Sequence, residues 1–444
     1  VFKSFIKANI QLFPAIGFIL RMNYICRMKK FLHAALCAAV FLTLCSCERT
    51  QTSHKGGYED VFVYFGLGYN DLSTNTLEYL MEIQEGILPG KERDEAFLAY
   101  VHTTKTYGDY ETDTPAYLIQ VYRKAGVTRL DTLKAYTANG IWSGTYPERY
   151  LSAKASSIRE VLLDVEKMFP SKHYGMMVSS HGTGWLPEKY LKGSESIWMA
   201  GTDAHGEVFP ATKSIGVQVT GTAGRLTTYE IDIRDFAEAI PMKMDYIIFD
   251  ACLMGGVEVA WQLKDKCDQI VFSPAEILRQ GFKYSTLSWD LFSGARPDLQ
   301  AVANDYFDTI NAQTGYMQSA TVTIVDCRKL DGLARSFKTI CDTHETVLSS
   351  ADRYMVQPYF YDGKKYFYDL RDYARVMGAT EEELRALDTA LAECVTLHRE
   401  TDKFFSVKQE RCCGLSCYIP INGRTDLNSY YRTLSWNDAT GLVK

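Results

Sequence analysis

YIIFDACLMGG, residues 246–256, joins a short apolar run to a glycine-rich turn that contains Cys252. The first four residues are typical of a strand buried on both faces of a parallel sheet. A second stretch of the same design, MMVSSHGTGW at residues 176–185, runs from apolar residues into His181. In an open α/β sheet, ligands bind beyond the carboxyl ends of the strands. We therefore expect His181 and Cys252 at the functional edge of one sheet.

Other short apolar runs alternate with longer amphipathic stretches, which predicts an α/β fold with a mainly parallel sheet and helices on both faces. The predicted strands are Val61–Phe65, Phe97–His102, Tyr117–Tyr122, Gly175–Ser180, Tyr246–Phe249 and Gln269–Phe272. Apolar residues at helical spacing predict a helix over 158–169, capped by Ser156 or Ser157, and another over 231–240. Residues 186–226 are rich in Gly, Thr and Ser and predict a long irregular excursion from the sheet.

The pattern changes after about Asp290. It predicts helices at Leu299–Ala312, Leu330–Leu348 and Thr380–Arg399, with isolated strands at Ala320–Val325 and Leu415–Ile419. We therefore divide the chain into a polar linker at 47–58, a sheet domain at 59–290, and an α+β C-terminal portion at 291–444 that packs on the sheet.

Residues 28–46 have the organisation of an export signal. Met28-Lys29-Lys30 precedes fourteen apolar-rich residues that end in Leu44-Cys45-Ser46-Cys47. Crossing a bilayer as a helix takes about 20 such residues, so this run is too short. It is similar to a bacterial lipoprotein signal, which implies cleavage before Cys47 and a lipid on its thiol. A plain signal peptide is the alternative. We expect Met28 to be the true start, with residues 1–27 as a miscalled extension.

Charge separates the signal from the rest of the chain. The net charge is −6, but residues 1–46 contain six basic residues and no acidic ones. The remainder has 42 basic and 54 acidic residues, or −12. A body this acidic argues against nucleic acid as a partner, because phosphate binding needs a basic stripe.

The sequence also lacks several catalytic motifs. Gly66-Leu67-Gly68 has no third glycine for a dinucleotide loop, and no phosphate-binding loop, serine-hydrolase elbow or His-Glu-x-x-His zinc motif occurs. These absences leave the cysteine and the histidine as the candidates for catalysis.

Cys252 and His181 together suggest nucleophilic catalysis. A thiolate is the reactive form of cysteine, and a nearby imidazole or a helix start stabilises it. Glycines in both turns allow a substrate to approach the backbone, whose N–H groups can bind an oxyanion. The alternative is that Cys252 is a small core residue and His181 a buried structural histidine.

Eight cysteines follow Cys47, and only Cys412, Cys413 and Cys417 form a cluster. Zinc sites usually combine Cys-x-x-Cys pairs with histidines, which this cluster lacks. A body of this size also has core enough without disulfides. We therefore expect buried thiols in a strand.

The two motifs, His-Gly-x-Gly-Trp at 181–185 and Asp-Ala-Cys-Leu-Met at 250–254, resemble those of the clostripain family of cysteine peptidases, relatives of caspases, legumains and gingipains. The likeness includes Val61-Phe62-Val63-Tyr64, Asn70-Asp71-Leu72, Ser273-Pro274-Ala275-Glu276, Gly281-Phe282, Tyr284 and the stretch 414–420. It therefore covers nearly all of the chain after the signal and implies a caspase-like sheet.

The resemblance implies a role for each site residue. Cys252 becomes the nucleophile and His181 the general acid/base, with no third catalytic residue required. The backbone N–H groups of Gly182 and Cys252 face the oxyanion. Asp250 lies in the pocket for the substrate residue before the cut, where a carboxylate selects Arg or Lys; an ion pair or cap at the strand end is its alternative role. Relatives with this preference usually offer a second acid, for which Glu276 is the candidate, although Arg279 is close enough in sequence to offset it.

The sequence and the resemblance thus predict an exported cysteine endopeptidase that cuts proteins or peptides after Arg or Lys through a Cys-His dyad, without a cofactor. Some members need calcium, but Asp203, Glu207 and Asp232 lack the spacing of an EF-hand. The lipid on Cys47 would attach the protein to a membrane of the bacterial cell envelope. A catalytically silent relative that binds peptides or proteins at the same edge is the second hypothesis.

Overall fold

The computed structural model describes residues 57–138, 142–143, 146–147, 149–188, 190, 218–222, 225–360 and 366–444. The predicted signal, Cys47 and most of the 186–226 excursion lie outside these residues. Of these, residues 57–129 and 133–444 belong to one compact unit, which contains most of the fold described below. No helix in the described ranges is both long enough and apolar enough to span a membrane.

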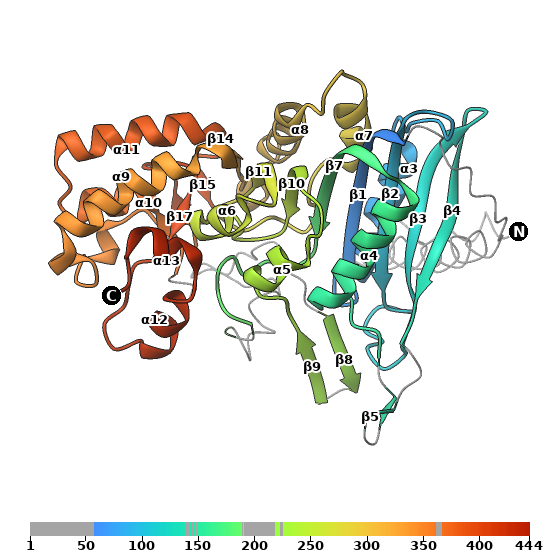
Figure 1. The fold of residues 1–444 in the computed structure, drawn as a ribbon, viewed down its shortest axis with the longest axis horizontal. Helices are drawn as coiled ribbons and strands as arrows, with labels where there is room; N and C mark the ends of the chain where they lie inside the picture. Colours follow the sequence, from blue (N-terminus) through green and yellow to red (C-terminus); the bar gives the residue numbers. More distant parts are fainter. Residues whose placement is uncertain are drawn as a thin grey trace, which may run out of the picture. The chain divides into compact units, whose positions relative to one another are not determined.

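A nine-stranded sheet organises this unit, in the order β14-β12-β11-β10-β7-β1-β2-β3-β4 (Figure 1). Its strands are β1 (Tyr58–Gly68), β2 (Glu95–Thr103), β3 (Ala116–Lys124), β4 (Val127–Tyr136), β7 (Ser171–Ser179), β10 (Met244–Asp250), β11 (Cys267–Phe272), β12 (Thr321–Asp326) and β14 (Val395–Glu400). The five strands from β11 to β2 are parallel, while β3, β12 and β14 pair antiparallel. All six strands predicted before Asp290 are confirmed, and so is the mainly parallel α/β sheet.

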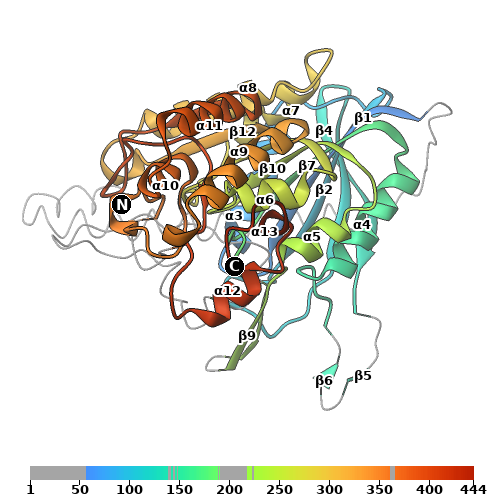
Figure 2. The same ribbon diagram turned by 60° about the vertical axis from the view of Figure 1, so that its left-hand side comes forward.

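Helices cover both faces of this sheet. One layer contains α3 (Ser73–Glu85), α7 (Tyr284–Phe292) and α8 (Leu299–Asn311). The other contains α4 (Ala155–Met168), α5 (Ile233–Ala239), α6 (Val257–Leu263) and α13 (Ser435–Thr440). Figure 2 shows α7 and α8 on the side of the sheet away from α5 and α6. The remaining helices are α9 (Leu330–Thr343), α10 (Leu370–Val376), α11 (Glu381–Cys394) and α12 (Thr425–Tyr431).

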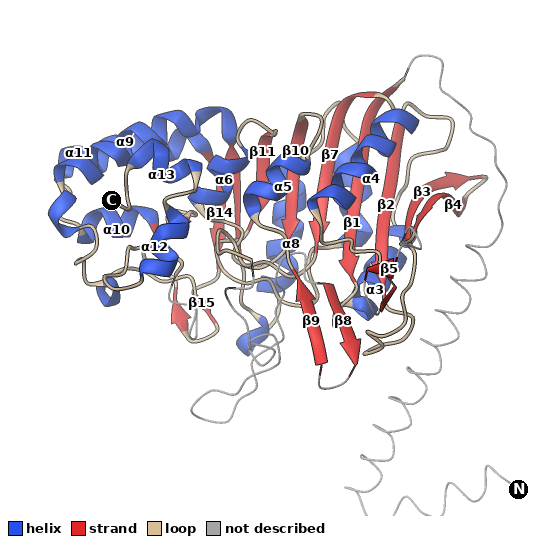
Figure 3. Ribbon diagram, turned by 60° about the horizontal axis from the view of Figure 1, so that its bottom comes forward, coloured by secondary structure: helices blue, strands red, loops and turns tan. Residues whose placement is uncertain are grey.

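Short two-stranded pairs accompany the main sheet. They are β5 (Trp142–Ser143) with β6 (Tyr146–Pro147), β8 (Gln218–Thr222) with β9 (Arg225–Tyr229), β13 (Tyr368–Asp369) with β17 (Ser416–Cys417), and β15 (Lys403–Phe404) with β16 (Val407–Lys408). In Figure 3, β8, β9 and β15 lie beyond the end of the sheet toward which β7 and β10 point.

Helix α4 confirms the predicted apolar face but not the predicted cap. Its buried residues are Ile158, Val161, Leu162 and Val165. Lys154 is the N-cap residue, and no side chain caps the helix. Because the helix begins at Ala155, Ser156 and Ser157 fall within its first turn instead of before it. The capping prediction is therefore wrong.

The C-terminal portion contributes strands to the main sheet. The helix predicted over Thr380–Arg399 is wrong for its last residues, because α11 ends at Cys394 and β14 begins at Val395. The sequence VTLHRE begins with alternating apolar and polar residues, as an edge strand does, and it pairs with β12. The helix predicted over Leu330–Leu348 is confirmed as α9 to Thr343, after which a short 3₁₀ turn follows.

Candidate active site

His181 and Cys252 lie in adjacent turns at one edge of the sheet. Strands β7 and β10 are parallel neighbours, with Ser179 opposite Asp250, so each candidate follows its strand by two residues. The turns touch at Gly182, where a Cβ atom would lie 2.1 Å from the Cys252 carbonyl oxygen and 2.8 Å from its nitrogen. Only glycine fits this approach, and the sequence-predicted juxtaposition of the two turns is present.

The thiol of Cys252 is covered by the loop that follows β11. Cys252 is fully buried; its Sγ accepts from the backbone N–H of Ile277 at 3.2 Å and donates to the Ile277 carbonyl at 3.6 Å. Two further bonds fix this loop to the cysteine turn, from Leu253 N to Ala275 O and from Gly255 N to Ser273 O. Leu253 has a φ of 61°, a conformation that is rare outside glycine and costs free energy.

His181 is held by an acidic side chain from a third element. Its Nε2 lies 2.5 Å from Oδ1 of Asp71, in the turn between β1 and α3, and the histidine is 2% exposed. Asn70 shapes that turn, because its Oδ1 accepts from the N–H of Leu72. The other Asp71 oxygen accepts from Arg279 at 2.6 Å. Burial by itself would raise the pKa of Asp71, but His181 and Arg279 outweigh it and lower that pKa below its ordinary value.

Asp250 and Glu276 are both completely buried. Oδ2 of Asp250 accepts from Ser179 Oγ at 2.9 Å and from the hydroxyl of Tyr284. Burial raises the pKa of Tyr284 well above its ordinary value, and the neighbouring Asp250 adds to this shift. Asp250 lies two residues before Cys252, and Glu276 lies between Ala275 and Ile277, whose backbones bond to the cysteine turn. The role of both carboxylates in substrate selection stays a prediction.

The cysteine cluster is only partly as expected. Cys417 is buried in strand β17, which confirms the prediction for that thiol. Cys412 and Cys413 are half-buried and precede the strand, so the prediction is wrong for them; the turn at 410–415 keeps them out of the ladder. In the described part of the chain, no three His, Cys, Asp or Glu side chains form a group suited to a metal ion.

Of the three calcium candidates, only Asp232 is described. It caps α5 by accepting from the N–H of Arg234, binds the Arg234 guanidinium and accepts from the hydroxyl of Tyr430. Asp203 and Glu207 lie outside the described residues.

Comparisons with known proteins agree with this architecture. The sequence model of the clostripain family matches residues 68–393. An inactive zymogen C11 protease from Parabacteroides distasonis superposes with a TM-score of 0.69 at 24% identity, covering 86% of this chain and 98% of that one. A secreted C11 cysteine protease from Bacteroides thetaiotaomicron, solved with an irreversible peptide inhibitor, has a TM-score of 0.65 at 20% identity, with coverages of 86% and 98%. No curated protein matches the chain.

The fold and the family match define a cysteine-type peptidase, a hydrolase of peptide bonds. The chain belongs to the clostripain family.

Replacing Gly182 by Ala should reduce the rate of peptide hydrolysis about 10²-fold. The new methyl group would force the two turns apart, and a displacement of reacting groups by about 1 Å lowers a rate by about this factor. The measurement is kcat/KM together with the thermal midpoint. Gly90→Ala is the matched control, since its Cβ would meet nothing closer than 3.8 Å. Full activity in Gly182→Ala would contradict the tight contact.

Replacing Arg279 by Gln should speed the alkylation of Cys252 by iodoacetamide. Arg279 is bonded to Asp71, and its loop carries the Ile277 backbone that covers the thiol. A partly exposed ion pair is worth at most about 1 kcal/mol, so we expect up to about a fivefold faster reaction. Arg328→Gln removes another Arg–Asp pair, with Asp326, and should change nothing. Equal rates in both variants would show that Arg279 does not hold the loop.

Proposed function

We propose that the protein is a cysteine endopeptidase in which Cys252 and His181 act as a dyad. The observation that carries this proposal is the contact of the two turns at Gly182, which brings a thiol and an imidazole to one sheet edge. His181 takes the thiol proton, the Cys252 sulfur attacks the carbonyl carbon, and the imidazolium gives that proton to the leaving amine as the peptide bond breaks. Water then attacks the thioester and gives a proton to His181, which returns it to the Cys252 sulfur as the acid is released.

The backbone supplies the remaining groups. The N–H groups of Gly182 and Cys252 lie at the contact of the two turns and are our candidates for binding the oxyanion, which is often the largest electrostatic contribution. Asp71 positions the imidazole through its bond to Nε2. This third group was not expected from the sequence.

We propose that the enzyme prefers Arg or Lys as the substrate residue before the cleaved bond, because Asp250 and Glu276 are acidic. Both carboxylates are buried, so the preference requires the loop over residues 273–282 to move when substrate binds. A buried cation needs a paired charge, which these two buried carboxylates supply in our proposal.

The test is the hydrolysis of pooled fluorogenic peptides by residues 48–444, with and without calcium. Cleavage after Arg or Lys supports the dyad and the acidic pocket, whereas cleavage after other residues keeps the dyad and rejects the pocket. An increase with calcium would add a cofactor that we do not expect.

A peptide-binding protein without activity is the second candidate. The observation in its favour is the fully buried Cys252 thiol under Ile277. Isothermal titration with the same pools separates the two, because binding without any hydrolysis would favour this candidate.

We also propose that the protein is exported and anchored through a lipid on Cys47. The support is the sequence of residues 28–47 and a structural neighbour described as secreted. Growth with an alkyne fatty acid should label the wild-type protein and not Cys47→Ser. Label on both would reject the anchor site.

A further inference from the structure

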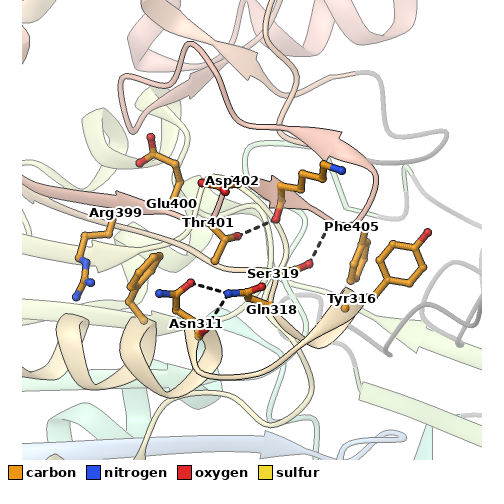
Figure 4. Close-up of a pocket in the computed structure, with 12 residues that line it drawn as sticks. Asn311, Tyr316, Gln318, Ser319, Arg399, Glu400, Thr401, Asp402 and Phe405 are labelled. Carbon is orange, nitrogen blue, oxygen red and sulfur yellow. Dashed lines mark hydrogen bonds between the residues drawn. The ribbon is translucent and has the colours of Figure 1, made fainter.

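A hollow of about 850 Å³ opens beside the ends of β12 and β14 (Figure 4). The end of α8, the 3₁₀ turn Gly315–Met317, the last residues of β14 and the hairpin β15–β16 form its walls. Its volume is within the range of about 300–1,000 Å³ that is usual for ligand pockets. Neither His181 nor Cys252 lines it.

The hollow lies at the same edge of the sheet as Cys252. Strand β12 runs antiparallel to β11, so its first residue, Thr321, lies where β11 ends; Thr321 also pairs with Glu400 at the end of β14. Hydrogen bonds join the intervening loops: Leu253 N donates to Ala275 O at 2.9 Å, and the hydroxyls of Ser273 and Thr321 lie 2.6 Å apart. The cysteine turn and the wall of the hollow are therefore linked along one edge.

The strand order gives the distance between the two places. Strands β10, β11, β12 and β14 are consecutive neighbours, and three spacings of about 4.8 Å amount to about 14 Å. An extended peptide rises about 3.3 Å per residue, so about four residues cover this distance. A substrate bound at Cys252 and running along this edge reaches the hollow.

The lining suits a peptide. Gln318 Nε2 donates to Asn311 Oδ1 and to the Asn311 carbonyl, and in the described part of the chain Gln318 Oε1 and Asn311 Nδ2 have no protein partner. These groups offer one acceptor and one donor side by side, which a peptide group can satisfy. Tyr316 packs against Phe405 with ring centroids 6.0 Å apart, and the two rings form an apolar wall.

Phe405 is held in a conformation that a side-chain-bearing residue rarely adopts. Its φ is 51°, and its N–H donates to Ser319 Oγ at 2.9 Å. Such strain persists only where the surroundings enforce it, and it is frequent at ligand-binding sites. Asp402 and Lys403 are exposed at the rim and form no ion pair within the described residues, so the rim carries both signs of charge.

We propose that this hollow binds the substrate chain about four residues from the bond that is cut. This inference rests on the proposed peptidase function. Its occupant is an uncharged or mixed-charge peptide segment with an apolar or aromatic side chain against Tyr316 and Phe405. The protein then selects substrates by a second site as well as by the residue next to the cut.

The experiment compares quenched fluorescent peptides that share one cleavable bond and extend three or six residues on each side. Lengthening one side should raise kcat/KM about tenfold, mainly through KM, as expected when an aromatic contact of about 1.4 kcal/mol is added. Tyr316→Ala should lower the ratio of kcat/KM for the long peptide to kcat/KM for the short peptide to about one. The matched control is Tyr107→Ala, an exposed tyrosine that follows β2, which should retain the wild-type ratio.

A wild-type ratio of one, or an unchanged ratio in Tyr316→Ala, would overturn the subsite. Failure to cut any peptide would overturn the proposed function instead, and a second readout then decides on the subsite. Cys252→Ala is irradiated with a long peptide that carries benzoylphenylalanine five residues from the central bond. Adducts within 315–318 or 402–405 support the proposal, and adducts only elsewhere overturn it. Unlabelled peptide should suppress the adducts and an added oligosaccharide should leave them unchanged, whereas suppression by the oligosaccharide would indicate a glycan occupant and overturn the proposal.

Discussion

Cys252→Ala should lower kcat/KM for peptide hydrolysis by about 10⁴-fold or more. The nucleophile and its acid/base act together, and removing the nucleophile from such a set of residues has an effect of this size. The fold should survive, since the substitution removes a single heavy atom, the sulfur that contacts the Ile277 backbone. His181→Ala should cause a loss of similar size. The measurement is initial rates on the best pooled peptide, with circular dichroism to check folding.

Cys267→Ala is the matched control for this experiment. Cys267 is also fully buried, but it lies at the start of β11, at the opposite end of that strand from the site, with its Sγ 3.9 Å from Cys327. It should retain full activity. If Cys252→Ala stayed active while folded, the dyad would be wrong and another nucleophile would be needed.

The sequence predicted the two catalytic turns because their signal is local. Each turn follows an apolar run buried on both faces, and the glycines next to His181 and Cys252 mark where backbones approach closely. Asp71 was not predicted, because it comes from a strand end more than a hundred residues earlier and only the sheet order brings it to His181. Arg279 was expected to offset Glu276, but its bonded partner is Asp71.

The fold shows the same division between local and distant information. Strands such as β1 and β7 are apolar along most of their length, so they could be read directly from the sequence. The sequence of β14 continues the helix predicted for α11, because β14 follows α11 without a break and its register comes from β12, some seventy residues away. Edge strands that are half-exposed carry a weaker apolar signal than central ones.

Glu258→Gln should remove most of the fall in stability between pH 5 and pH 8. Glu258 lies in the first turn of α6; its Oε1 accepts from Tyr418 N at 2.8 Å and from the Tyr431 hydroxyl at 2.7 Å, while its buried Oε2 has no hydrogen-bond partner in the described part of the chain. Burial raises the pKa of Glu258 to about 7, although the bonds from Tyr431 and the backbone partly oppose this.

The sign of the pH effect follows from that shift. The folded protein keeps the proton to about pH 7, whereas the unfolded chain releases it near its ordinary pKa of 4.5. The stabilisation is complete below pH 4.5 and is lost as the pH rises to 7, a change of about 3 kcal/mol. Gln mimics the protonated carboxyl, so the variant should match the wild type at pH 5 and be more stable at pH 8 in guanidinium unfolding. Glu382→Gln, at an exposed position of α11, should keep the wild-type slope, and the same slope in Glu258→Gln would show that the carboxylate is tolerated in its buried site.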